Sequence, residues 1–180
     1  MPLLLKDATK FALRAQKRPR AEGDKGTAVY PVQINDDAFE LQLVPSGSDS
    51  LRVKSEPLCI GEGRCAVCLS ISSEMHDELF KIEEGLSELV KEKHPDTTWF
   101  KSTRPPAGNY SANLHVKFYG DLQVYDSEGE KTEAPKSWRG VLVTPILNLK
   151  AWVNDKGAGI WWNLVAVKIT RPPPRAFTFV

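Results

Sequence analysis

The sequence predicts a mainly β protein in which short strands form a small barrel and one helix is inserted. Short runs rich in β-branched and aromatic residues recur at intervals of about ten residues, with turn-forming clusters between them. A single segment, residues 74–93, has the periodicity of an amphipathic helix. The chain shows no strand–helix alternation and no internal repeat, which argues against a parallel sheet or a solenoid.

Residues 1–27 are predicted to form a basic arm that precedes the barrel. Residues 10–20 could form a short helix, which Pro19 and the glycines at 23 and 26 would end. Strands are expected only after this arm. Their ranges before the long helix are 28–34, 39–44, a weaker 51–54, and 64–71.

The helix over residues 74–93 has one continuous apolar face. Spacings of four, three, four and three residues place five side chains on that face: Met75, Leu79, Ile82, Leu86 and Leu89. Ser72 or Ser73 can cap the first turn, and Pro95 ends the helix. The apolar face would cover one end of a barrel, which favours an OB-fold over a sandwich of immunoglobulin type.

Strand patterning resumes after the helix. The expected ranges are 97–101, 114–118, 122–125, 138–153 and 160–169. Pro145 lies inside the fourth range, and because proline lacks a backbone N–H it favours an edge or a bulge there. The predicted barrel domain therefore spans residues 28–170. Residues 171–180 form an extended C-terminal tail, stiff and proline-rich at first and apolar at its end.

The formal net charge of +1 conceals a strong segregation of charge along the chain. Basic residues dominate residues 1–20 and 136–180, whereas acidic residues concentrate in 74–92 and 121–133. Such segregation can create a basic face on a nearly neutral protein. No apolar run approaches the ~18 residues of a membrane span, and the apolar start at residues 2–5 is too short for a signal peptide. An intracellular protein is expected.

The three cysteines do not predict a disulfide framework, because their number is odd. Cys65 and Cys68 form a C-x-x-C pair, which is half of a zinc site, but the sequence offers no second pair. On a strand, an offset of three residues would also point the two thiols to opposite faces. We expect Cys59, Cys65 and Cys68 to be buried thiols, with structural zinc as the minor alternative.

Aromatic and basic residues are interleaved in the sequence. Each of the five tryptophans lies near a basic residue, and single-stranded nucleic acid needs both flat side chains for base stacking and positive charge along its backbone. About half of the tryptophans are expected in the core, including one of the adjacent pair Trp161 and Trp162. The candidate nucleic-acid-binding residues are Trp99, Lys101, Arg104, Lys117, Lys136, Trp138, Arg139, Lys150, Trp152 and Lys156.

Catalytic signatures are missing from the sequence. It contains no G-x-S-x-G, no H-E-x-x-H, no phosphate-binding loop and no G-x-G-x-x-G. The acidic residues of segment 121–133 could hold magnesium, but a turn that also contains a lysine is more typical of a solvated loop. We expect a protein that is not an enzyme and has no cofactor and no metal.

Three stretches follow one another in an order known from a viral family: residues 110–118 (YSANLHVKF), 124–131 (VYDSEGEK) and 138–141 (WRGV). They are followed by residues 150–152 (KAW), Gly157 and Gly159, and an apolar strand over 164–169. This succession resembles the single-stranded DNA-binding proteins of short-tailed phages (podoviruses) and of large double-stranded DNA viruses. The resemblance covers about residues 64–170 and implies an OB-fold that coats single strands in replication, recombination or repair.

The C-terminal tail of this chain differs from the tail of the family that it resembles. The family's tail is long and acidic with an aromatic tip, whereas residues 171–180 are basic, proline-rich and apolar. The resemblance therefore does not extend to recruitment of partners by an acidic tail. We expect residues 171–180 to pack on a neighbouring subunit instead.

These observations predict a non-catalytic viral protein that binds single-stranded DNA with little sequence preference. RNA is the alternative ligand, and replication proteins and further copies of the chain are the expected partners. The basic run at residues 17–20 is typical of a nuclear localisation signal, of a nucleic-acid contact, or of a solvated tail. The host nucleus or a viral replication site is the expected location.

Two rival functions remain open at the level of sequence. A capsid-associated β-barrel would use its basic arm to neutralise a packaged genome, with its charge concentrated in residues 1–20. A metal-dependent nuclease would need Asp126 and its acidic neighbours.

Overall fold

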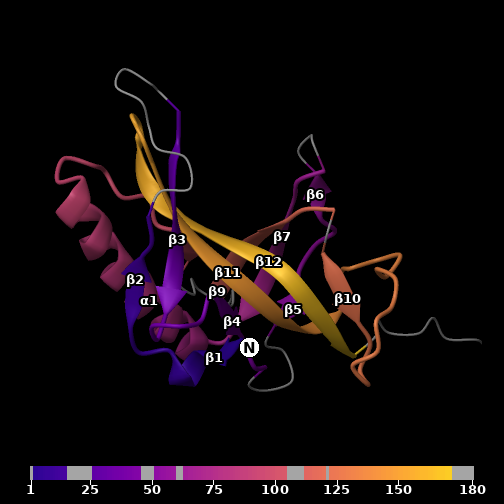
Figure 1. Cartoon of the computed structure of the whole chain (residues 1–180). Coiled ribbons are helices and arrows are strands. Elements are labelled where there is room, and N and C mark those ends of the chain that lie inside the picture. The colour runs from indigo at the N-terminus through magenta and orange to yellow at the C-terminus, as the bar shows by residue number, and fades with distance from the viewer. Residues whose placement is uncertain are drawn as a thin grey trace, which may run out of the picture.

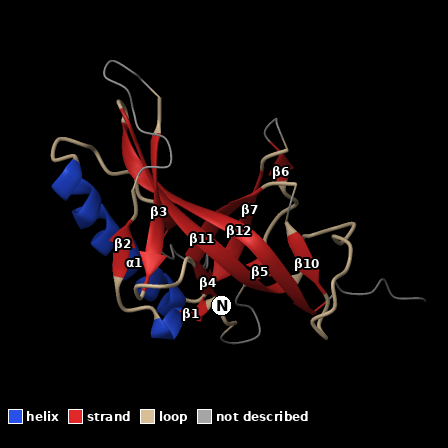
Figure 2. Cartoon of the chain, in the orientation of Figure 1, coloured by secondary structure: helices blue, strands red, loops and turns tan. Residues whose placement is uncertain are grey.

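A closed ring of five strands forms the centre of the molecule (Figures 1 and 2). The computed structural model describes residues 2–15, 26–45, 51–59, 63–104, 112–120 and 122–171. In spatial order the ring consists of β11 (Leu142–Asn154), β5 (Arg52–Val53), β7 (Cys65–Ile71), β9 (Ala112–Phe118) and β12 (Gly157–Arg171). β12 pairs with β11 and closes the ring; β9 and β12 run parallel, and the other neighbours are antiparallel. This barrel, with its inserted helix, confirms the predicted OB-fold.

Shorter elements extend the ring. The strands β3 (Ala28–Ile34) and β4 (Glu40–Gln42) pair with β11, and β10 (Gln123–Tyr125) pairs with β12. The remaining elements are β1 (Leu3–Leu4) on β4, β2 (Phe11–Leu13) on β3, β6 (Leu58–Cys59) on β7, β8 (Thr103–Arg104) on β9, the short 3₁₀ helix η1 (Leu5–Asp7), and the helix α1 (Ser73–Lys93). Within the described residues, β11 therefore pairs with more strands than any other: β3, β4, β5 and β12.

Most predicted elements are present, and two are wrong. Residues 97–101 contribute only an isolated bridge from Trp99 to Ala158. Residues 11–13, expected within a helix, form β2, because pairing with β3 outweighs their local helical preference. Strands β1 and β2 attach this part of the predicted arm to the barrel. The boundaries after residues 27 and 170 stay predictions, and residues 16–25 and 172–180 lie outside the described part.

The core follows from side-chain alternation in the strands and from one face of α1. Every second residue of β11 is buried, from Val143 to Val153, and the residues between them are half-buried. The helix adds Met75, Leu79, Ile82 and Leu86 to the same core, as its periodicity predicts, whereas Leu89 is only partly buried. The Ser72 hydroxyl accepts a hydrogen bond from the Met75 amide at 3.1 Å and caps the helix.

The irregularity expected near Pro145 is also confirmed. Pro145 itself stays in register with Val167 of β12, and the register shifts just after it, between Ile146 and Leu147. The Pro145 carbonyl accepts a hydrogen bond from the Leu43 amide at 3.1 Å. The shift leaves Val165 of β12 without a partner on β11, so the extra residue of the bulge belongs to β12.

A buried carboxylate connects α1, the segment after it and β12. Glu83 on α1 is 2% exposed, and it accepts hydrogen bonds from the Ser102 amide at 2.6 Å and the Ser102 hydroxyl at 3.0 Å. The Ser102 hydroxyl in turn accepts a hydrogen bond from the indole nitrogen of Trp162 at 2.6 Å. These contacts fix the chain that leaves the helix against the barrel.

The expectation of three buried thiols is wrong. Cys59 and Cys65 form a disulfide with Cα atoms 4.0 Å apart, and Cys59 is exposed. The two are register partners because β6 and β7 form an antiparallel pair, which the sequence did not predict for residues 58–59. Cys68 lies outside the disulfide and is half-buried. With its sulfur bonded to Cys59, Cys65 is not available as a zinc ligand.

We predict that Gly157→Ala destabilises the fold by about 1–3 kcal/mol. A Cβ at Gly157 would overlap the Phe100 ring and lie 2.6 Å from the Thr98 carbonyl oxygen. The matched control is Gly85→Ala on α1, where a Cβ meets no neighbour and should stabilise the helix by about 0.5–1 kcal/mol. Urea unfolding followed by circular dichroism measures both, and equal stability of the two variants would contradict the packing described here.

Candidate nucleic-acid interface

The outward side of the β11–β12 pair gathers aromatic and basic side chains. Alternation along β11 turns Lys150 and Trp152 outward, and the register places Trp161 of β12 opposite Lys150. Segment 98–100 runs beside the tip of this pair and adds Phe100. We call these residues, together with Lys117 of β9, the aromatic face; it occupies the end of the long β11–β12 ribbon near β3 in Figure 1.

Three rings of the aromatic face form a stacked series. The centroids of Phe100 and Trp152 are 6.1 Å apart with their planes 13° from parallel. Trp152 and Trp161 continue the series at 6.3 Å and 23°. The Lys117 ammonium lies 5.4 Å from the centre of the Trp161 ring, within cation–π range. Phe100 is 49% exposed, so the series presents ring surface to solvent.

Backbone contacts and two glycines set the positions of these rings. Trp152 lies over Gly159, its partner across the strands, where a Cβ would come within 2.9 Å of the indole. Phe100 is fixed because its amide donates to the Ala158 carbonyl at 2.8 Å, and the Ala158 amide donates to Thr98 at 2.8 Å. The glycines at 157 and 159 thus make the room that the two rings fill.

Positive charge borders the stacked rings. Burial lowers the pKa of Lys117 below its ordinary value, and the nearby Arg64 guanidinium lowers it further. An arriving phosphate would relieve the repulsion between these two cations, so the pair favours an anionic ligand. Lys156 is exposed in the two-residue turn between β11 and β12, where the Asn154 side chain accepts from the Lys156 amide at 2.9 Å.

The structure brings together several of the residues predicted from the sequence. Lys117, Lys150, Trp152 and Lys156 belong to the aromatic face or to the adjacent turn. Lys101 follows Phe100, but its ammonium lies 5.3 Å over the Phe80 ring of α1. Trp99 is half-buried and packs against the core. Arg104 belongs to β8, and its side chain lies outside the described part.

Lys136, Trp138 and Arg139 lie apart from the aromatic face, in the loop that leads into the start of β11. Trp138 packs on Phe118 at 6.4 Å and on the barrel core. The Glu56 carboxylate holds this loop: it accepts from the Ser137 hydroxyl at 2.5 Å and from the amides of Trp138 and Arg139. These hydrogen bonds, the one from Ser137 foremost, lower the pKa of Glu56.

Trp161, Phe100 and Arg64 are the residues of this surface that the sequence prediction missed. One of Trp161 and Trp162 was expected to face inward, and Trp162 is 1% exposed while Trp161 faces outward. Because neighbouring residues of a strand face opposite sides, an inward Trp162 implies an outward Trp161. The sequence alone does not say which of the two tryptophans faces inward. Phe100 had no such signal, because its position depends on contacts with β12.

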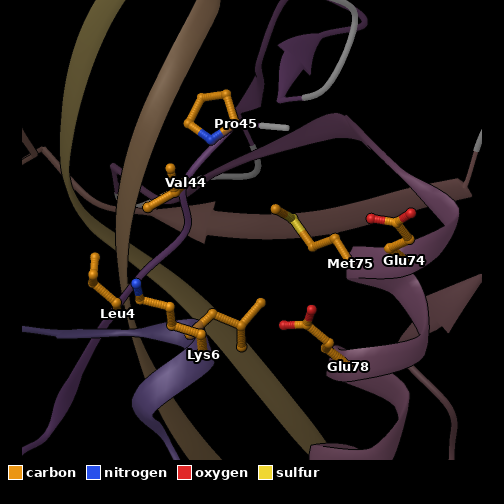
Figure 3. Close-up of a pocket in the computed structure, with 8 residues that line it drawn as sticks. Leu4, Lys6, Val44, Pro45, Glu74, Met75 and Glu78 are labelled. Atoms are coloured by element: carbon orange, nitrogen blue, oxygen red, sulfur yellow. The ribbon is translucent and has the colours of Figure 1, made fainter. Parts of the chain in front are cut away.

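A separate pocket lies between η1, the chain after β4 and the first turns of α1 (Figure 3). Its volume is about 320 Å³, and apolar side chains such as Val44 and Met75 line it. Its charged lining residues are Lys6, Glu74 and Glu78. With two carboxylates against one ammonium, the net charge of the lining is negative and disfavours a phosphate there. The pocket is therefore a weaker candidate for nucleic acid than the aromatic face.

Within the described ranges, no three His, Cys, Asp or Glu side chains are grouped so that they could hold a metal ion. In the same part of the chain, no helix has both the length and the apolar character that a membrane crossing requires.

Comparison with solved structures finds the same fold in phage proteins. The chain is similar to the single-stranded DNA-binding protein of bacteriophage Enc34, with a TM-score of 0.54 and 16% identity over 91% of this chain and 92% of that one. The Enc34 protein in complex with single-stranded DNA gives 0.54 and 16% over 82% and 93%. The single-stranded DNA-binding protein gp2.5 of bacteriophage T7 gives 0.52 and 18% over 72% and 85%.

No protein-family model matches the chain, and no curated protein matches its sequence. The likeness is thus one of fold. It confirms that the chain resembles phage single-stranded DNA-binding proteins, as the ordered motifs predict.

We predict that the contribution of Glu56 to stability depends on pH. Because folding lowers the pKa of Glu56 below its ordinary value of 4.5, its contribution is present above that value and is lost as pH falls through the folded-state pKa. Urea unfolding of the wild type and of Glu56→Gln from pH 7 to pH 3 measures this. The wild type should be the more stable at pH 7, and the gap should close in acid; a gap that does not change with pH would contradict the assignment.

Proposed function

We propose that the chain is a non-catalytic protein that binds single-stranded DNA with little sequence preference through its aromatic face. One observation carries the proposal: the stacked series of Phe100, Trp152 and Trp161 lies on an outward sheet surface with Lys117 and Lys150 beside it. Bases would stack on the rings, and the lysines would contact the phosphates.

The energetics of this arrangement suit a single strand. Base–aromatic stacking is worth about 1–3 kcal/mol per base, and it tolerates any sequence because every base has a π-face. Paired bases in a duplex are already stacked on one another and cannot reach the rings, so the surface would discriminate against duplex. Lysine contacts to phosphate add affinity that falls with salt.

The fold comparison supports this function over the capsid alternative. The solved structures named above are phage single-stranded DNA-binding proteins, and one was determined in complex with single-stranded DNA. Each of them matches between 72% and 91% of this chain.

Several finer points stay predictions. Lys101, Arg104, Lys136, Trp138 and Arg139 are proposed as further phosphate or base contacts. Replication proteins are proposed as partners, and self-association is proposed through residues 171–180, nearly all of which lie outside the described part.

The test is a titration of fluorescein-labelled oligo-dT and of duplex DNA at low and moderate salt, read by anisotropy. We expect binding of oligo-dT but not of duplex, with roughly a tenfold or greater loss between 50 and 200 mM salt if about three phosphates are contacted. Trp152→Ala and Trp161→Ala should each weaken binding by about 5-fold to 100-fold. Phe39→Ala removes an exposed ring that is not part of the stacked series and is the matched control.

An arm variant separates the proposal from its rival. Replacing Lys17, Arg18 and Arg20 with glutamine leaves the strands β1 and β2 unchanged. Loss of single-strand affinity in this variant, with full affinity in Trp152→Ala, would overturn the aromatic-face proposal and favour the genome-neutralising arm.

A further inference from the structure

We infer that the outward side of the β11–β12 pair carries a second nucleotide site, at the end opposite to the aromatic face. The site is a pocket of about 180 Å³ beside β10, with Tyr125 and Lys168 at its wall. It would take one base of the same DNA strand, and Lys168 would contact the adjoining phosphate. The inference rests on the proposed function and extends it to a defined second subsite.

Register places this pocket on the same side of the ribbon as the stacked rings. Going along β11 from Lys150, the outward residues are Asn148, Ile146 and Thr144, and their partners on β12 are Asn163, Ala166 and Lys168. Ile146, Ala166, Thr144 and Lys168 all line the pocket. The surface between the two sites is therefore formed by the pair Asn148 and Asn163, whose amides are hydrogen-bonded at 3.2 Å.

The chemistry of the lining fits a base with a phosphate attached. Ile146 and Ala166 give the pocket an apolar floor, and Tyr125 adds an aromatic ring. The Tyr125 hydroxyl donates to the Gln123 side chain at 2.6 Å, which limits the orientations of that ring. Lys168 supplies a cation next to this ring: its side chain is exposed, and it is the register partner of Tyr125 in the β10–β12 pairing.

The length of the bound oligonucleotide determines whether it can occupy the second site. Trp152 and Thr144 are eight residues apart on β11, which corresponds to about 26 Å along a strand. A single nucleotide cannot span that distance, whereas binding sites of about 4–16 nucleotides per OB-fold are common. Short oligonucleotides should occupy the aromatic face alone, and longer ones should reach Tyr125 as well.

Negative charge after β10 limits how far the DNA strand can extend beyond the pocket. The turn that follows β10 carries Glu128 and Glu130, both exposed, and its Gly129 lines the pocket. Residues 126–131 carry three carboxylates against the single ammonium of Lys131, and this negative balance disfavours phosphates beyond Lys168. The pocket is thus placed as the last subsite on the ribbon.

The test compares oligo-dT of roughly four and roughly twelve nucleotides by anisotropy, at lengths that bracket the lower site sizes of OB-folds. Lys168→Gln and Tyr125→Ala should weaken binding of the longer oligonucleotide by about fivefold or more and leave the shorter one unchanged. Tyr125→Phe keeps the ring and should retain most of the affinity. Lys91→Gln changes an exposed lysine on α1 and is the matched control. Lys168 is exposed, so its substitution does not threaten the fold.

The outcomes separate this inference from the proposed function. If Trp152→Ala weakens both oligonucleotides while Lys168→Gln and Tyr125→Ala change neither, the second site is wrong and the proposed function stands. If the wild type binds neither oligonucleotide at low salt, both are wrong. Equal losses for both lengths in Lys168→Gln would also overturn the second site, because a charge effect would then act without contact.

Discussion

The continuous antiparallel pairing of β11 with β12 is the interaction on which the rest of the structure depends. Every other residue of β11 enters the core, while Lys150 and Trp152 between them face outward. A register slip of one residue would put the tryptophan into the barrel and a core valine on the surface. The same hydrogen-bond ladder therefore closes the barrel and orients the aromatic face, so that the geometry of this face and the stability of the barrel share one determinant.

A second constraint comes from the buried Glu83. Burying a carboxylate is costly unless hydrogen bonds satisfy it, and Ser102 supplies two, while Trp162 donates to the same serine. The result is a defined path for residues 98–102 between helix and barrel. This path and the backbone hydrogen bonds of Phe100 and Thr98 with Ala158 together hold Phe100 beside Trp152, so a polar contact in the interior contributes to the geometry of an apolar surface.

Most of the fold could be predicted from the alternation of the strands and the periodicity of the helix, because both patterns are local properties of the sequence. Segment 97–101 was misjudged since its single bridge to Ala158 depends on a distant strand. The Cys59–Cys65 disulfide escaped prediction for a related reason: strand β6 is two residues long and leaves no periodic signal. In the interface, Trp152 and Lys150 could be named from composition, but Trp161 and Phe100 required knowledge of parity and of tertiary contacts.

The tight connection between β11 and β12 also bears on the order of folding. Only Asp155 and Lys156 separate the two strands, so the contacts between them are local in sequence and close with little loss of chain entropy. Closure of the barrel costs more chain entropy, because β11 must also pair with β5, a two-residue strand far earlier in the chain. The hairpin is thus the natural nucleus, and the seam at β5 the natural point of local opening. Two of the three stacked rings, Trp152 and Trp161, lie on this hairpin, so the contact between them is local in sequence.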